Sequence, residues 1–265
     1  MAEEKRKTAV ITGATSGIGA AFARKLAQCG FDLVITGRRE DKIRTLAAEI
    51  AERSGVDVEV VIAELSDENA VEDLARRISG IRDLEILVNN AGFSIKSLFH
   101  EEDRTGHEAL IKVHVLAAVR LVHAALPGMI ERGRGAVINV SSTSSFTPRP
   151  EGAIYAASKC FLNLFSESLH LELCRSGVRI QALCPGLTRT DFHEKLGLRA
   201  DDVYRRKAPV KAMSPESVVE ASLRCLEKNK PICIPGTFNR AAALAVRLMP
   251  RAFLRRLLLF RRTRR

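Results

Sequence analysis

Apolar, strand-like runs alternate with helical patterns along most of this chain. The runs lie at residues 8–12, 31–36, 57–63, 84–89, 135–140, 178–184 and 231–235. Between them, apolar residues recur at spacings of three and four, as in 20–29 and 71–78. Several runs are almost continuous Val, Ile and Leu, which is expected of parallel strands covered on both faces. The pattern therefore predicts an α/β fold, a doubly wound parallel sheet with helices on both faces.

One domain accounts for most of the 265 residues, because no repeat, low-complexity segment or Pro/Gly/Ser linker divides them. We expect this domain to span 1–239 and to carry an inserted loop at about 187–213. Such a loop after a late strand lies near the carboxyl edge of the sheet, where ligands bind. The remaining residues, 240–265, predict a basic amphipathic helical extension.

The net charge of +11 is concentrated in that extension. Nine arginines and no acidic residue lie between Arg240 and Arg265, and subtracting them leaves +2 for the rest of the chain. Leucine and phenylalanine alternate with these arginines, which gives a helix an apolar stripe and a cationic face, interrupted at Pro250. Docking on the body or a sister subunit is at least as well supported as binding to an anionic membrane. Nucleic acid is the least favoured partner, because the body is nearly neutral and stacking aromatics are few.

Six cysteines are scattered without a C-x-x-C pair, and we expect them to be reduced thiols with no metal site. No stretch of about 18 uncharged apolar residues is present, so we expect no spanning helix. The start, MAEEKRK, carries both signs of charge and does not suit a secretory leader. These features together favour a cytoplasmic protein, with peripheral membrane contact through the extension left open.

A glycine-rich turn follows the first strand-like run. Glycine at 13, 17 and 19 removes side chains where the backbone has to turn and approach a pyrophosphate at the start of a helix. Because a strand precedes this turn and a helix follows it, we predict a nucleotide phosphate site. Its candidate residues are Gly13, Thr15, Ser16, Gly17, Ile18 and Gly19.

A candidate acid–base pair lies in the segment AIYAASK. Tyr155 and Lys159 are four residues apart in a helical pattern and therefore share one face. A phenol with a pKa near ~10 is a poor catalyst at neutral pH unless a nearby cation stabilises the phenolate. Lys159 provides that cation, so we expect an unusually acidic Tyr155.

Four motifs occur in order at matching spacing: T-G-x-x-x-G-I-G at 12–19, N-N-A-G at 89–92, Tyr155-x-x-x-Lys159 and Pro185-Gly186. Over about residues 7–235 the chain resembles the short-chain dehydrogenase/reductase family. The resemblance implies a Rossmann-type fold and an oxidoreductase. Ile234-Pro235-Gly236 and the segment 248–251 resemble a broad bacterial subgroup, the DltE-like and ketoacyl-reductase-like members.

The resemblance also assigns roles to individual residues. Ser142 polarises a carbonyl, Tyr155 transfers the proton, and Lys159 also bonds the nicotinamide ribose. Asn90, Ala91 and Gly92 belong to the cofactor site, as do Glu64 and Leu65 beside the adenine. Pro185, Gly186, Thr188 and Thr190 are expected beside the carboxamide and phosphates.

The choice of cofactor follows from Arg38 and Arg39, which come after the second strand. An NAD enzyme places an acid there for the ribose 2′-hydroxyl, whereas two guanidiniums attract a 2′-phosphate. Basic residues at a helix start oppose the helix dipole, so stability does not explain them. We therefore predict NADP(H) as the cofactor.

His114 departs from the family pattern, which usually has an asparagine there that supports a proton relay to the lysine. A histidine can donate and accept, and would titrate near neutral pH. An equally supported alternative is that His114 is only a core-facing helix residue.

We expect hydride transfer between nicotinamide and a carbonyl or secondary alcohol of a hydrophobic small molecule, such as a ketone, a ketoacyl thioester or a steroid-like compound. The expected substrate wall is mostly apolar: Phe93, Ser94, Phe146, Phe192, Leu196, Leu198, Tyr204 and Met213. Arg205, Arg206, Lys207 and Lys211 either attract an anionic carrier or form a solvated face. The rival hypotheses are a cofactor-binding protein without turnover and a membrane-surface interaction protein. Family helices around 101–126 and 153–176 imply a homo-oligomer, a dimer or tetramer.

Overall fold

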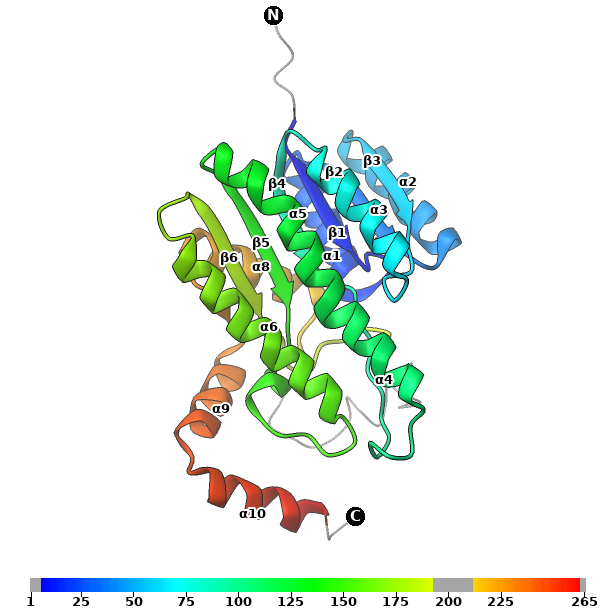
Figure 1. The fold of residues 1–265 in the computed structure, drawn as a ribbon. Coiled ribbons are helices and arrows are strands. Elements are labelled where there is room, and N and C mark those ends of the chain that lie inside the picture. The colour runs from blue at the N-terminus through cyan, green and yellow to red at the C-terminus, as the bar shows by residue number, and fades with distance from the viewer. Residues whose placement is uncertain (1–5, 193–211, 263–265) are drawn as a thin grey trace, which may run out of the picture.

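The computed structural model describes residues 6–192 and 212–262. Seven parallel strands form one sheet in the order β3-β2-β1-β4-β5-β6-β7 (Figure 1). Their bounds are β1 Thr8–Thr12, β2 Asp32–Gly37, β3 Val58–Ile62, β4 Leu84–Asn89, β5 Gly135–Val140, β6 Val178–Leu183 and β7 Ile232–Cys233. The predicted doubly wound parallel α/β sheet is thus confirmed. Its last strand is shorter than the expected run at 231–235.

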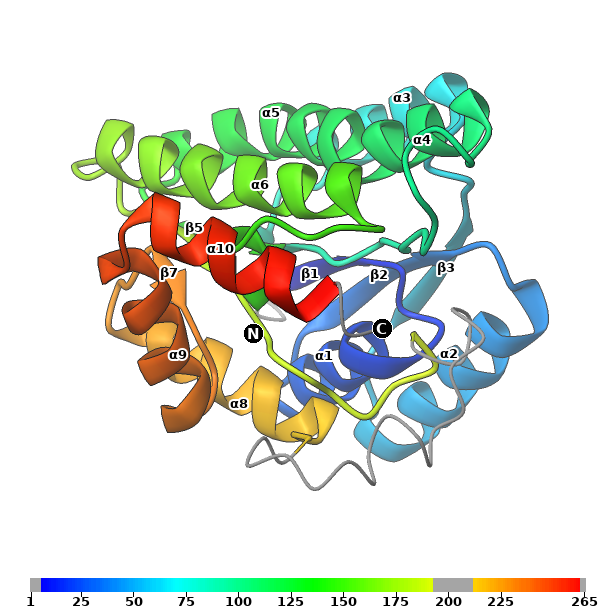
Figure 2. The ribbon, with the colours of Figure 1, turned by 90° about the horizontal axis from the view of Figure 1, so that it is seen from below.

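Helices cover both faces of the sheet (Figure 2). On one face lie α1 Gly17–Gln28, α2 Glu40–Ser54 and α8 Pro215–Glu227. On the other lie α3 Glu68–Ser79, α4 Arg104–Ile111, the π-helical turn η1 Lys112–Leu116, α5 Ala117–Glu131 and α6 Ala153–Glu172. A 3-10 turn, η2 Thr143–Phe146, connects β5 to the loop before α6.

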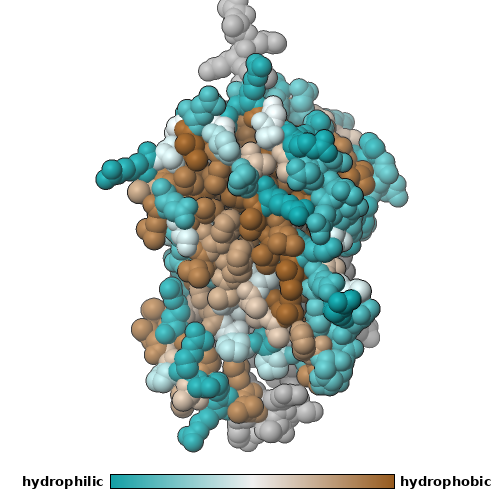
Figure 3. Space-filling model, in the orientation of Figure 1, coloured by the Kyte–Doolittle hydropathy of each residue, from teal (hydrophilic) through white to brown (hydrophobic). Residues whose placement is uncertain are grey.

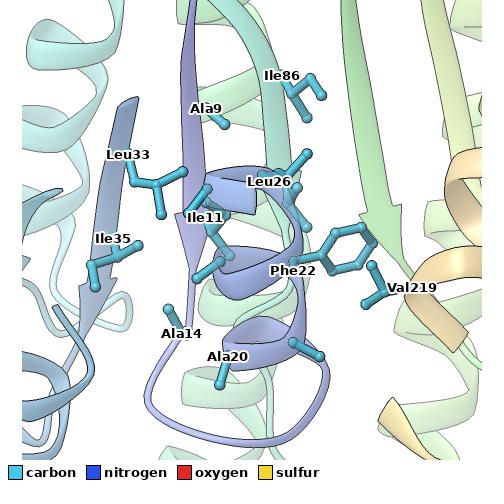
Figure 4. Packing of buried hydrophobic residues seen from close by; sticks show 14 of the residues in the cluster. Ala9, Ile11, Ala14, Ala20, Phe22, Leu26, Leu33, Ile35, Ile86 and Val219 are labelled. Carbon is cyan, nitrogen blue, oxygen red and sulfur yellow. The ribbon is translucent and has the colours of Figure 1, made fainter. Parts of the chain in front are cut away.

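Two hydrophobic clusters hold these layers together, one on each face. In the first, Phe22 and Leu26 of α1 pack against Ile11 of β1, and Phe22 also lies next to Val219 of α8 (Figure 4). All of these side chains are buried. Burial of a large apolar side chain contributes about 1.5–3 kcal/mol, so this cluster fixes α1 and the turn before it against the sheet.

The chain crosses the sheet between β3 and β4, so that β1 pairs with β2 on one side and with β4 on the other. At this switch point the connections after β1 and β4 leave in opposite directions and open a crevice at the carboxyl ends of the strands. The glycine-rich turn follows β1 and the N-N-A-G segment follows β4. The topology therefore brings together two motifs that lie more than seventy residues apart.

The helical stretch Arg104–Glu131 is long and apolar enough to cross a membrane by length and composition. We expected no spanning helix because no long uncharged apolar stretch is present, whereas Arg104–Glu131 is apolar overall and contains isolated charged residues. In the fold, Leu121, Val122 and Ala125 of this stretch are buried in the second cluster. A core helix that packs on a sheet can be equally long and apolar, so the length and composition of this stretch are weak evidence for a membrane span.

The basic extension contains two helices, α9 Thr237–Leu248 and α10 Arg251–Arg262. Both lie beyond the carboxyl edge of the sheet (Figures 1 and 2). The Arg247 guanidinium lies 6.0 Å from the ring centre of Phe146 in η2, and Leu254 of α10 is buried. Part of the extension is therefore docked on the body, and the expected boundary at 239/240 falls inside α9.

Candidate active site

A cavity of about 420 Å³ opens at the carboxyl ends of the strands. Its lining includes every catalytic and cofactor-binding residue expected from the sequence except Gly19. Residues from the turns after β1, β2, β3, β4, β5 and β6 and from α6 meet in this one pocket. They comprise Gly13, Thr15, Ser16, Gly17, Ile18, Arg38, Arg39, Glu64, Leu65, Asn90, Ala91, Gly92, His114, Ser142, Tyr155, Lys159, Pro185, Gly186, Thr188 and Thr190.

The turn after β1 has the geometry that its glycines predict. Gly13 and Gly17 have φ values of 66° and 59°, in the left-handed region. A β-carbon at Gly13 would lie 2.7 Å from the Cα of Ala91, and one at Gly17 would lie 2.8 Å from Cγ2 of Thr190. Side chains at these positions would thus collide with the opposite walls of the crevice.

The expectation that Gly19 contacts the cofactor is not met. Gly19 lies behind the turn, where a β-carbon would collide with the side-chain amide of Asn90 and with the carbonyl of Gly13. Its place in the motif is explained by close packing of α1 against the turn.

Asn90 ties the two motifs of the crevice together. Its Nδ2 donates to the carbonyl oxygens of Thr12 at 2.9 Å and Gly13 at 3.0 Å. The backbone N–H groups of Asn90 and Ala91 both donate to Oγ1 of Thr12, each at 3.0 Å. These four bonds fix the glycine turn relative to β4.

The two arginines after β2 are engaged in different contacts. Arg38 donates to Oε2 of Glu64 at 2.9 Å, whereas Arg39 donates to the hydroxyls of Thr15 at 2.7 Å and Ser16 at 3.0 Å. Burial alone would raise the pKa of Glu64, but the bonds from Arg38 and Ser66 hold it below its ordinary value. Glu64 is thus an ionised counter-charge to Arg38.

Tyr155 and Lys159 lie one turn apart on α6, and both are buried. The Ser142 hydroxyl accepts the backbone N–H of Ser144 at 3.1 Å and lies near enough to the phenol of Tyr155 to favour its ionised form. Ser142 has extended backbone geometry and caps η2 directly after β5. The end of a buried strand and one face of a buried helix therefore bring the three predicted catalytic side chains together.

Burial controls the ionisation of this group. It raises the pKa of Tyr155 above 10, against smaller opposing effects of the Ser142 hydroxyl and the Arg149 charge. Burial also lowers the pKa of Lys159 to about 7. The expectation of an unusually acidic Tyr155 is wrong for this pocket, because desolvation dominates the pKa of the phenol. The Lys159 ammonium, which was expected to lower that pKa, donates to the Val140 carbonyl at 2.8 Å.

His114 lies in the π-helical turn η1 and is buried. Its Nε2 accepts the backbone N–H of Phe93 at 3.0 Å, and its Nδ1 lies 3.0 Å from the Ser158 hydroxyl. Ser158 in turn donates to the Tyr155 carbonyl at 2.9 Å, so Nδ1–H is the donor to Ser158. Both ring nitrogens are used by a neutral imidazole.

Burial, with a smaller contribution from the Lys159 charge, holds the pKa of His114 well below its ordinary value. The expectation that His114 titrates near neutral pH is therefore wrong. The alternative of a core-facing helix residue describes its surroundings, although the ring also lines the cavity.

The segment after β6 closes the other side of the crevice. Thr143 N–H donates to the Pro185 carbonyl at 3.0 Å, which joins this segment to η2. Thr188 donates to the Gly186 carbonyl at 3.0 Å and forms an isolated bridge with Met213. A β-carbon at Gly186 would collide with the amide of Asn239 in α9, so the extension also packs behind this segment.

Only part of the expected substrate wall lies on the cavity. Phe93 and Phe192 line it, whereas Ser94, Phe146 and Met213 are not among its lining residues. Leu196, Leu198 and Tyr204 lie outside the described residues, as do Arg205, Arg206, Lys207 and Lys211.

Ten lining residues were not expected from the sequence, and the three whose side chains bear most on the substrate are Val113, Leu187 and Arg149. A cation between two prolines, six residues before Tyr155, was the available signal for Arg149.

The residues present fit a nicotinamide dinucleotide. The left-handed glycine turn precedes the N-terminus of α1, where free backbone N–H groups can donate to phosphate oxygens. Thr36 presents to the cavity a buried hydroxyl without a hydrogen-bond partner among the described residues. Arg38 and Arg39 lie at the same end of the cavity as Thr36, and Lys159 lies at the other end.

Comparisons with known proteins agree with this geometry. A family model described as short chain dehydrogenase matches residues 7–200. Sulfoacetaldehyde reductase 2 of Chromohalobacter salexigens is 35% identical over 210 residues, which is 77% of this chain and 82% of that protein. Human inactive hydroxysteroid dehydrogenase-like protein 1 is 35% identical over 69% of this chain and 56% of its own length.

A solved structure is also similar, a short-chain dehydrogenase from Sphingobium yanoikuyae in complex with NADPH. It has a TM-score of 0.82 and 34% identity, covering 90% of this chain and 91% of that one.

Proposed function

Since this chain belongs to the short-chain dehydrogenase family, we propose that it is an NADP(H)-dependent oxidoreductase acting on a carbonyl or secondary alcohol of a hydrophobic substrate. The observation that carries the proposal is that the side chains of Ser142, Tyr155 and Lys159 line one cavity, with Tyr155 and Lys159 buried one helical turn apart on α6. We place the protein in the ketoacyl-reductase-like, DltE-like bacterial subgroup, on the motifs around Pro235 and Pro250.

The bound nicotinamide would supply or accept the hydride. The Ser142 hydroxyl donates to the carbonyl oxygen and holds it beside the phenol. Tyr155, which burial keeps protonated at neutral pH, donates its proton as negative charge develops on that oxygen. Lys159, whose ammonium nitrogen lies 5.8 Å from the ring centre of Tyr155, stabilises the phenolate that remains. A protonated Tyr155 suits the reductive direction.

Support for NADP(H) comes from Arg38 and Arg39, which flank the adenosine end of the crevice, and from the NADPH-bound neighbour. A 2′-phosphate there would replace Glu64 as the partner of Arg38. The new ion pair would be stronger, because a phosphate carries more charge than a carboxylate. NADH would make no such contact.

The test is oxidation of NADPH with a panel of ketones and ketoacyl thioesters, comparing wild type with Tyr155→Phe. We expect turnover to fall by about 10²–10⁴-fold in the variant while NADPH binding, measured by fluorescence, persists. Equal, slow oxidation by both proteins across the panel would instead support the rival hypothesis, a cofactor-binding protein without turnover.

Homo-oligomer formation is supported by an apolar face over α5 and α6 (Figure 3). Phe161, Leu164 and Leu171 of α6 are exposed there, as are Leu116 and Ile130 of the neighbouring stretch. Burial of this face in a dimer or tetramer would remove it from water. Sedimentation of wild type and Leu164→Glu would test this assignment.

Peripheral contact with an anionic membrane, by an otherwise cytoplasmic protein, is supported by α10. Phe253 and Leu259 are exposed beside Arg251, Arg255 and Arg256. Co-sedimentation with vesicles containing phosphatidylglycerol should be lost in Phe253→Ser/Leu259→Ser, while the exposed-surface variant Arg175→Gln keeps it. Equal sedimentation of all three proteins would rule out this contact.

A further inference from the structure

Arg149 is a cation at the catalytic end of the cavity. It lies in the loop between η2 and α6, and its guanidinium carbon is 5.6 Å from the ring centre of Tyr155. The other cations among the described lining residues are Arg38 and Arg39, at the adenosine end, and Lys159, which donates to the Val140 carbonyl. Arg149 is therefore the cation that faces the space beside the phenol.

No carboxylate balances this charge within the described part of the chain. Arg24, Arg38, Arg44 and Arg120 each have an ion-pair partner within 4.0 Å, whereas Arg149 has neither an ion pair nor a hydrogen bond to a described residue. The Arg149 side chain is only partly buried, and its guanidinium lines the cavity with its nitrogens open to a ligand. Such an arrangement is suited to receiving an anion from outside.

The local chain is arranged to hold this side chain in place. Pro150 follows Arg149 and restricts its backbone to extended conformations, and Pro148 before it has a fixed φ of its own. Glu151, the next residue, has a φ of 58°, a left-handed conformation that costs a non-glycine residue energy. At Gly152 a β-carbon would lie 3.1 Å from Cδ and 3.2 Å from Nε of Arg149, so the side chain lies directly over this glycine.

The walls around the same space are apolar. Phe93, Val113, Leu187 and Phe192 line the cavity there, and the ring centre of Phe192 is 5.9 Å from that of Tyr155. A ligand that fills this end is therefore held by one cation and by apolar surface, and its reactive oxygen is held by Ser142 and Tyr155.

We propose that Arg149 is a specificity-determining residue that binds a carboxylate close to the reactive carbonyl, so that the substrate is an oxo acid with an apolar chain. This inference rests on the proposed function. In the reaction the carbonyl carbon gains the hydride of the reduced cofactor and the oxygen gains the Tyr155 proton. The product is a hydroxy acid together with the oxidised cofactor, and solvent restores the proton of Tyr155.

A matched substrate pair tests the role of the carboxylate. The probes are 2-oxo-4-phenylbutanoate and its ethyl ester, which share a carbon skeleton and differ in charge. We expect wild type to prefer the acid in kcat/KM, and Arg149→Gln to lower the acid-to-ester ratio by about 10- to 100-fold, mainly through KM for the acid. Arg149→Lys should recover part of the ratio, and the control Arg175→Gln, which removes an equal charge from the exposed surface, should keep it.

A binding measurement that needs no turnover completes the test. Calorimetric titration with 4-phenylbutanoate, with and without NADP⁺, should show binding to wild type and to Arg175→Gln that Arg149→Gln loses. If wild type binds this acid through Arg149 but oxidises NADPH with neither probe, the proposed function fails and the anion site stands. An unchanged acid-to-ester ratio in Arg149→Gln would overturn the inference. So would an equal loss of kcat for both probes with a shifted pH profile, because Arg149 would then act through Tyr155.

Discussion

The ammonium nitrogen of Lys159 lies 5.8 Å from the ring centre of Tyr155, and both side chains are buried. Two ionisable groups thus share a small volume from which water is largely excluded. Each is shifted towards its neutral form, the phenol upwards and the amine downwards. The consequences reach stability as well as catalysis.

Lys159 should make the unfolding free energy depend on pH between 7 and 10. Its pKa is about 7 in the fold and ordinary in the unfolded chain, so the unfolded state binds more protons in this window and stability rises with pH. We expect Lys159→Met to be more stable than wild type at pH 7, by up to about 4 kcal/mol, with the difference shrinking towards pH 10. Urea unfolding at a series of pH values measures it, and a difference independent of pH would contradict the shift.

His114 should have a similar effect at lower pH. The fold keeps it neutral, whereas the unfolded chain takes up a proton as the pH falls through about 6.5, so stability is lost below that value. We expect the loss between pH 7 and 5 to be smaller in His114→Asn, by at most about 2 kcal/mol. Exposed His123→Asn serves as the control. If the unfolding free energies of wild type and His114→Asn changed in parallel with pH, His114 would take up a proton, and so be charged, in the fold as it is in the unfolded chain.

Glu64 should compete with a 2′-phosphate for Arg38. The pair is partly exposed, so its removal has a modest effect, and we expect Glu64→Gln to bind NADPH about two- to fivefold more tightly without a change for NADH. Glu49→Gln, which frees Arg24 of a similar partner far from the cavity, should change neither affinity. Fluorescence titration measures both cofactors, and equal tightening for NADPH and NADH would exclude competition at Arg38.

Gly13 and Gly30 form a matched pair for testing the turn after β1. Both have positive φ, but a β-carbon at Gly30 meets nothing within 4 Å, whereas one at Gly13 meets the backbone of Ala91 at 2.7 Å. We expect Gly30→Ala to cost about 1 kcal/mol and Gly13→Ala about 1–3 kcal/mol more, with loss of NADPH binding only in Gly13→Ala. If Gly30→Ala and Gly13→Ala lost similar amounts of thermal stability and of NADPH affinity, the close approach of Gly13 to the Ala91 backbone would not explain the glycine in the motif.

The sequence predicts the fold well because local patterns determine it. Apolar runs set the strands, and the residues of the nucleotide crevice follow the strand ends directly, as Gly13 follows β1 and Asn90 follows β4. Spacing alone also places Tyr155 and Lys159 on one face of α6. These relationships require no knowledge of how distant segments approach.

Burial and long-range contacts are what the sequence could not provide. The spacing of Tyr155 and Lys159 implies a cation near a phenol, but it does not reveal that desolvation decides the direction of both pKa shifts. Arg149 was missed because its place beside Tyr155 depends on the turn at Glu151 and Gly152. Gly19 was assigned to the ligand because a motif does not distinguish contact with a ligand from contact between helix and turn.

The stacking of Arg247 on Phe146 makes the C-terminal extension a structural neighbour of the turn that presents Ser142. A force on that extension, whether from a fused tag, a surface or a bound protein, is transmitted to the loop holding the carbonyl-polarising hydroxyl. We therefore expect removal of α9 to loosen the turn that presents Ser142, so that an affinity tag is better attached at the opposite end of the chain.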